Sequence, residues 1–107
     1  MEFINQYSVE LTDECKKDIR NIYTYIRNNL DDEDAANRLI DKFEFAIGNL
    51  EDFPKIYAVI DKYENTRRIY RRIVVNNYII LFTIEEKYKK VYVSHIYYKG
   101  RDYLKEI

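Results

Sequence analysis

The sequence predicts an α+β fold in which an antiparallel helical hairpin covers one face of a sheet. Three observations lead to this prediction. One short stretch near the N-terminus alternates apolar and polar residues, two longer stretches repeat apolar residues at spacings of three and four, and three β-rich runs follow them. The order is therefore one strand, two helices and three strands, which suits a layer of helices packed on a single sheet.

The length and composition fit one compact domain over residues 1–107. Of the 107 residues, 47% are apolar and 35% are charged, an ordinary balance for a globular protein. We see no internal repeat, no low-complexity segment, no secretory signal and no apolar run near the ~20 residues of a membrane span. A single Cys cannot form an internal disulfide. We therefore expect a soluble, cytoplasmic protein without a membrane partner, a cofactor or a structural metal.

The first elements are a strand and a helix. Residues 7–11 alternate between apolar and polar side chains, which predicts a strand ending near Leu11 with one buried face. Either Thr12 or Asp13 then offers an N-cap for a helix from about Asp13 to Asn29. The apolar stripe of this helix consists of Cys15, Ile19, Ile22, Tyr23, Ile26 and Leu30.

A second helix follows a short acidic run. Asp31 or Asp32 is the expected N-cap, and Phe53-Pro54 ends the helix because the residue before a proline disfavours helical backbone. The apolar stripe consists of Ala36, Leu39, Ile40, Phe43, Ala46, Ile47 and Leu50. Two helices joined by a short turn form an antiparallel hairpin. For residues 55–66 the sequence allows either a short strand or a packed loop.

Three β-rich runs make up the rest of the predicted sheet. They are Arg67–Val75, Tyr78–Ile84 and Val91–Tyr98. Asn76-Asn77 tolerates the positive φ of a tight hairpin turn, and the charged residues 85–90 read as an exposed turn. We therefore expect an antiparallel meander.

Charge divides the chain into two halves. Residues 62–107 carry 11 Lys and Arg against 5 Asp and Glu, whereas residues 1–61 carry 7 against 14, so that a total of −1 conceals halves of +6 and −7. The basic half is densest over residues 67–72. Guanidinium groups gathered on a strand indicate an anionic partner.

Alternation along the first strand of the meander separates two sets of side chains. The set expected against the helices is Ile69, Ile73 and Val75, and the set expected on the open face is Arg68, Tyr70 and Arg72. Burying an unpaired guanidinium is costly, which decides the assignment. Arg67 and Arg71 share the core side, and we expect them to reach around the start of the strand or to pair with a helix carboxylate such as Asp18.

The last strand brings the only His of the chain near further cations. His95 is followed by Tyr97, Tyr98, Lys99 and Arg101. Beside the arginine strand, these residues would form a basic, aromatic pocket that binds phosphates, stacks bases and supplies a titratable group. Strict alternation groups His95 with Val91 and Val93 on the core side unless a bulge intervenes.

The order of elements and several short stretches resemble the RelE/ParE toxin superfamily of bacterial toxin-antitoxin pairs over nearly the whole chain. The stretches are Ala35-Ala36 at the start of the second helix, Leu50 before Phe53-Pro54, residues 72–80, and Tyr98 before Arg101-Asp102. The resemblance implies a small α+β toxin that is normally bound by a cognate antitoxin, either as a hetero-oligomer or with a homodimeric toxin.

The superfamily contains ribosome-dependent mRNA endonucleases and inhibitors of DNA gyrase. For cleavage, the resemblance implies a cation on the scissile phosphate, a second cation from the last strand, and an acid or base beside them. The candidate catalytic residues are Arg72, His95, Tyr98 and Arg101, and the candidate substrate-binding residues are Arg68, Tyr70, Tyr97 and Lys99.

Some features of the sequence favour the gyrase inhibitor, and others favour the nuclease. The RelE-like nucleases usually carry a basic residue after the aromatic that opens the middle strand, where this chain has Ile79, and they tend to be strongly basic. The local field around Arg68 and Arg72 nevertheless suits a bound phosphate. We expect an mRNA endonuclease acting on the ribosome, with a gyrase inhibitor as the alternative and a non-toxic module for an acidic partner as the third hypothesis.

Overall fold

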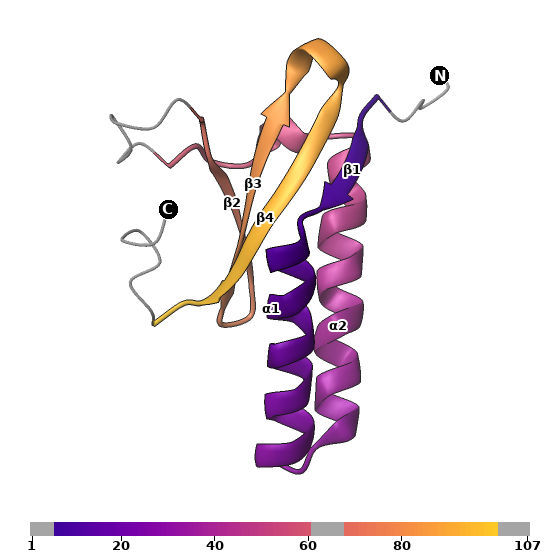
Figure 1. Ribbon diagram of the computed structural model, residues 1–107, viewed down its shortest axis with the longest axis vertical. Coiled ribbons are helices and arrows are strands. Elements are labelled where there is room, and N and C mark those ends of the chain that lie inside the picture. The colour runs from indigo at the N-terminus through magenta and orange to yellow at the C-terminus, as the bar shows by residue number, and fades with distance from the viewer. Residues whose placement is uncertain (1–5, 61–67, 101–107) are drawn as a thin grey trace.

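The computed structural model describes residues 6–60 and 68–100, and it confirms the predicted α+β fold (Figure 1). The elements are β1 (Ser8–Leu11), α1 (Asp13–Thr24), α2 (Glu33–Gly48), β2 (Arg71–Val75), β3 (Tyr78–Glu85) and β4 (Lys90–Tyr98). A π-helical turn (Tyr25–Asn29) continues α1, and short 3-10 turns cover Asn49–Glu51, Pro54–Ile56 and Glu86–Tyr88.

The four strands form one mixed sheet in the order β1-β4-β3-β2. The predicted meander of β2, β3 and β4 is antiparallel, and β1 pairs with β4 in parallel. Figure 1 shows α1 and α2 side by side on one side of the sheet, with the far end of the hairpin extending beyond the strands. We call the side of the sheet toward the helices the helix-side face and the opposite side the outer face.

Side chains predicted as caps start both helices. The Thr12 hydroxyl accepts the N–H of Cys15 at 3.1 Å, and one Asp32 oxygen accepts the N–H of Ala35 at 2.9 Å. Asp31, just before α2, has a positive φ of 50°. The first helix differs from expectation at its end, because regular α-helix stops at Thr24 and the π-helical turn carries the chain on to Asn29.

The core lies between the helices and the helix-side face. Phe43 and Leu50 pack from the helical side against fully buried residues of β3 and β4. The latter are Ile80, Phe82, Val91 and Val93. Cys15 is also fully buried, and burial raises the pKa of its thiol to about 12. A thiol in this environment is a packing group and a poor nucleophile.

The start of the arginine strand differs from expectation. The ladder to β3 begins at Arg71, so Ile69 precedes it, and its side chain is 68% exposed where alternation predicted a core residue. Of the undecided segment, residues 55–60 are described: they complete the 3-10 turn at Pro54–Ile56 and then make a single antiparallel bridge from Val59 to Arg71. The prediction for Arg67 lies outside the described residues.

Arg71 does not pair with Asp18, because main-chain oxygens close to β2 bind it. Its Nη1 donates to the carbonyl oxygens of Tyr57 at 2.7 Å and Lys55 at 3.2 Å. The guanidinium thereby fastens the segment before β2 to the edge of the sheet, a structural role.

Candidate functional site

Arg72, Leu81 and His95 form a row across the outer face of the sheet. Arg72 pairs with Leu81, and Leu81 pairs with His95. The register shifts at the next position, where Phe82 pairs with Val93, so Ser94 is an extra residue in β4. This bulge moves His95 from the core side, where strict alternation placed it, to the outer face beside the arginine strand.

Asp18 of α1 holds His95 in place. Its Oδ2 lies 3.1 Å from His95 Nδ1 and also accepts the N–H of Ile96 at 3.0 Å. The imidazole stacks on the ring of Tyr97, with centroids 5.1 Å apart and an interplanar angle of 21°. Sequence reasoning missed this pair because no local signal indicates that α1 runs along the edge of β4. The contact follows from Thr12, whose N–H and hydroxyl donate to the carbonyl oxygens of Val93 and Ser94.

The middle of the outer face is apolar. Tyr70, Ile79, Leu81 and Tyr97 form a second buried cluster, each at most 9% exposed. Tyr70 and Tyr97 were predicted to contact a substrate, but their rings offer a partner little surface. Neighbouring strands lie about 5 Å apart, so roughly 10 Å and the Leu81 side chain separate the backbones at Arg72 and His95.

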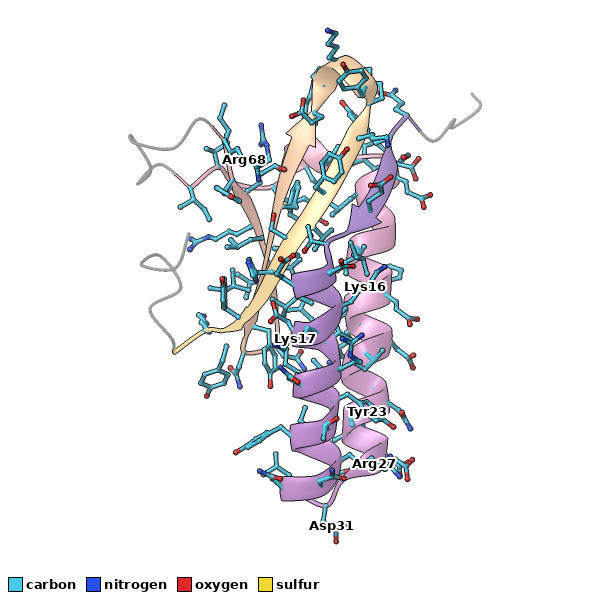
Figure 2. All side chains as sticks on the ribbon, viewed as in Figure 1. Lys16, Lys17, Tyr23, Arg27, Asp31 and Arg68 are labelled. Atoms are coloured by element: carbon cyan, nitrogen blue, oxygen red, sulfur yellow. The ribbon has the colours of Figure 1, made fainter. Side chains whose placement is uncertain are left out.

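Arg68 lies at one end of the outer face. It lines a hollow of about 450 Å³ together with Thr83, Tyr92, Ser94 and Glu85. Figure 2 shows Arg68 beside the strands, far from Asp31 at the tip of the helical hairpin. The acidic helix start and this exposed arginine therefore occupy distant parts of the molecule.

Two further predicted residues, Tyr98 and Lys99, lie at the end of β4 and just beyond it. Tyr98 pairs with Tyr78 on the helix-side face, where the two rings meet edge to face at 5.8 Å. The main-chain N–H of Lys99 donates to Asn77, and its side chain is exposed. Arg101 lies outside the described residues. Of the four candidate catalytic residues, the structure brings Arg72 and His95 to the same face.

A groove of about 820 Å³ separates the far half of the hairpin from the lower end of the sheet. Its apolar lining includes Ile22, Tyr25 and Leu30 from the helical side and Tyr78 and Tyr98 from the strands. Tyr25 and Leu30 are 54% and 58% exposed. Burial, and then the neighbouring Tyr98, raises the pKa of Tyr78. Sequence reasoning assigned Leu30 and Tyr98 to other roles and did not predict this groove.

Two further properties concern the described residues alone. Residues 6–60 and 68–100 contain no cluster of three or more His, Cys, Asp or Glu side chains suited to a metal ion. None of the helices in these ranges combines the length and the apolar character needed to cross a membrane.

The helical hairpin, the mixed sheet and the basic edge strand together define the RelE/ParE class of small α+β toxins. Residues 9–103 match the family described as the ParE toxin of the type II toxin-antitoxin system parDE. The chain belongs to this family, and it is a type II toxin of the RelE/ParE superfamily.

Solved structures share the fold at low sequence identity. A chain of the chromosomal ParDE system from P. aeruginosa matches with a TM-score of 0.69 and 13% identity over 89% of this chain and 98% of the other. The RelBE2 toxin-antitoxin complex from Mycobacterium tuberculosis matches with a TM-score of 0.58 and 15% identity, over 90% of this chain and 94% of the other. The archaeal RelE-RelB complex from Pyrococcus horikoshii matches with a TM-score of 0.55 and 20% identity, over 90% of this chain and 98% of the other. No curated protein matches the chain.

Proposed function

We propose that this toxin inhibits DNA gyrase by surface contact, without chemistry of its own, and that a cognate antitoxin neutralises it. The observation that carries the proposal is the apolar centre of the outer face. Leu81 is fully buried between Arg72 and His95, and Ile79 is 3% exposed at the position where RelE-like nucleases usually carry a basic residue. Cations that clamp the phosphate assist phosphoryl transfer, and within residues 6–60 and 68–100 the candidate cation in register with His95 is Arg72. A protein contact requires no such clamp.

A second observation favours an mRNA endonuclease as the other candidate. His95 shares the outer face with Arg72, and Asp18 fixes its Nδ1 side. A carboxylate that orients an imidazole in this way is a common arrangement for a general base. Arg72 would stabilise the negative charge that develops on the phosphate, because it stays protonated throughout.

The two candidates separate in a paired assay. Purified protein is added to a gyrase supercoiling reaction and to a cell-free translation reaction. Lost supercoiling with intact mRNA supports the proposal, and ribosome-dependent cuts with normal supercoiling overturn it in favour of the nuclease. If neither reaction is affected, the non-toxic binding module takes precedence over both.

Replacement of His95 sharpens the comparison. His95→Gln keeps a hydrogen-bonding side chain beside Asp18 but removes the titratable group. Gyrase inhibition should stay within about twofold of the unchanged chain, whereas loss of a general base would lower mRNA cleavage by about 10²-fold or more. Lys87→Ala is the matched control, since it changes an exposed residue in the turn between β3 and β4.

The antitoxin part of the proposal rests on the structural relatives and on the surface. The RelBE2 relative is described as a toxin-antitoxin complex, and the archaeal relative as a RelE-RelB complex. An acidic or amphipathic segment would cover the basic strand or the groove lined by Tyr25 and Leu30. Co-expression with the product of the adjacent gene should restore growth and yield a co-purifying complex. Growth arrest that persists, with no complex recovered, would count against the antitoxin.

A further inference from the structure

Two rows of opposite charge run along the solvent side of the helical hairpin. The members of each row are spaced by three, four or seven residues, which places them on one face of their helix. The basic row of α1 and its π-helical turn is Lys16, Arg20 and Arg27, and the acidic row of α2 is Asp34, Asp41 and Glu44. Figure 2 shows Lys16, Tyr23 and Arg27 one after another along α1, toward the tip of the hairpin at Asp31.

The two rows lie at matching levels and do not neutralise each other. All six charged side chains are exposed, and among the ion pairs within residues 6–60 and 68–100 none involves a member of either row. Arg20 and Asp41 line the same hollow, so they share one level of the antiparallel hairpin. One turn closer to the sheet on each helix, Lys16 is level with Glu44. Like charges one turn apart within each row disfavour each helix taken alone.

An apolar crease separates the two rows. Its hollow measures about 410 Å³, and its apolar lining consists of Ile19 and Tyr23 of α1 and Ile40 of α2. These three side chains are half-buried, because they pack on the core and also border the hollow. An apolar seam with opposite charges along its two sides is the pattern by which paired helices select a partner and its orientation.

This pattern is complementary to a second copy of itself. A two-fold axis that runs along the crease, parallel to the helices, places α1 of each copy opposite α2 of the other. Rotation about this axis keeps every residue at its level, so Arg20 meets Asp41 of the second copy and Lys16 meets Glu44 of the second copy. A nucleic-acid strand fits less well, because the acidic row beside the basic one repels phosphates.

We propose that the solvent side of the helical hairpin is an interface between two copies of this chain, which join as an antiparallel four-helix bundle. The charge rows set the register, and the two apolar creases close on each other between them. The outer faces of the two sheets then point away from the interface on opposite sides of the dimer. The inference goes beyond the proposed function and does not depend on gyrase as the target.

Concentration and salt provide the first test. The ¹⁵N-labelled full chain is diluted while its amide spectrum is recorded, and the signals of Tyr23 and Ile40 should move with concentration. Sedimentation should detect a dimer that weakens as NaCl rises from about 50 mM to about 500 mM, because salt screens exposed charges.

Reversal of the basic row provides the second test. Lys16→Glu combined with Arg20→Glu should weaken dimerisation at least about tenfold, because acidic rows then face each other in both halves of the interface. Lys87→Glu combined with Lys99→Glu is the matched control, since it changes the net charge equally at exposed positions away from the hairpin. The control should dimerise within about twofold of the unchanged chain.

Mixing two variants tests whether the rows pair between chains. Asp41→Lys combined with Glu44→Lys should also dimerise at least about tenfold more weakly than the unchanged chain. An equimolar mixture with the Lys16→Glu, Arg20→Glu variant should form a heterodimer about as tightly as the unchanged chain dimerises, because opposite charges face each other again. If either variant does not fold, the amide shifts and the salt dependence decide on the unchanged chain.

Several results would overturn the inference. They are a chain that stays monomeric up to about 1 mM, a dimer that both variants leave intact, and a mixture that shows no rescue. Concentration-dependent signals centred on β2 or on the groove beside Tyr25 would place the contact elsewhere, and duplex DNA that shifts the Tyr23 signal would assign the basic row to phosphates. None of these measurements involves gyrase or growth, so failure here is distinct from failure of the proposed function.

Discussion

Arg72 is the residue at which the candidate site and the charge asymmetry meet. It is exposed on the outer face, at the centre of β2, in register with Leu81. Its neighbour Arg71 bonds main-chain oxygens of the preceding segment, so two consecutive arginines have different tasks. Alternation along the strand predicted this division, and of the two alternatives for Arg71 the pairing with a helix carboxylate such as Asp18 is wrong.

Replacing Arg72 should abolish toxicity and leave the fold intact. Arg72→Ala removes an exposed cation, and exposed substitutions of this kind usually change the free energy of unfolding by less than about 0.5 kcal/mol. Growth after induction measures toxicity, and the denaturation midpoint measures stability. Lys87→Ala serves as the control that loses a cation elsewhere. Full toxicity of Arg72→Ala at normal expression would show that this residue does not contact the target.

Glu86 provides a test of stability against pH. It accepts a hydrogen bond from Tyr7 at 3.0 Å, and it binds Lys89 and Lys55, the latter at 3.2 Å. The bond from Lys89, followed by that from Tyr7, lowers the pKa of Glu86 to about 2 from its usual 4.5. A carboxyl whose pKa is lower in the folded state contributes stability above its unfolded pKa, and that contribution disappears as the pH falls.

The expected outcome for Glu86→Gln follows from this sign. The difference in melting temperature between the unchanged chain and Glu86→Gln should be constant above about pH 5 and should shrink from about pH 4.5 toward pH 2. The exposed position makes the difference small, and added salt should reduce it. A difference that does not change over this pH range would show that the bonds to Glu86 do not stabilise the fold.

At the scale of elements, the turn between β2 and β3 depends on one residue. Asn76 has a φ of 51°, a left-handed conformation that Asn adopts more readily than most other residues. Asn76→Ala should therefore destabilise the fold by about 1 kcal/mol, and Asn76→Gly should be neutral or stabilising. Asn77→Ala is the matched control at the neighbouring position. Equal stability of all three variants in chemical denaturation would contradict this account.

The elements themselves were largely predictable, because each carries a local signal. The caps Thr12 and Asp32 and the turn at Asn76 were found where the sequence placed them. The start of β2 and the face of His95 were not. The first depends on the segment that bonds Tyr70 and Arg72 from outside, and the second on the one extra residue at Ser94. Both are decided by pairing between distant segments, which local periodicity does not record.

The candidate site was predictable in kind but only partly in composition. Its cations and its His were visible in the sequence, whereas Asp18 and the apolar Leu81 between Arg72 and His95 emerge only from the assembled sheet. The burial of Tyr97 was equally hidden, because Tyr suits both a packed and an exposed position.

At the scale of the whole molecule, β1 joins the beginning of the chain to its last described strand. Glu10 pairs with Tyr92 in the parallel ladder, and its carboxylate binds Lys90 at 3.2 Å. Ser8 and Thr12 donate main-chain bonds to Lys89 and Val93, so alternation directs the N–H of Glu10 to β4 as well. This strand borders the fully buried Val91 and Val93.

Two substitutions at one position measure how much this ladder contributes. Glu10→Ala loses an exposed ion pair and should change the free energy of unfolding by less than about 1 kcal/mol. Glu10→Pro also removes the N–H that faces β4 and leaves an acceptor unpaired, so it should cost about 1–3 kcal/mol more. Urea denaturation gives both values. Equal stability of the two variants would mean that β1 contributes little through its main chain.

The parallel pairing of β1 with β4 also determines when the sheet can be completed while the chain is being synthesised. Leu11 is paired with Val93, so the first strand has no neighbour in the sheet until the last one has been made. At ~5–20 residues per second, the ribosome needs roughly 4–16 s to add the intervening chain. The basic strand β2 is made well before the sheet that displays it is complete. The nascent chain therefore completes its outer face only after residues 90–98 have been made.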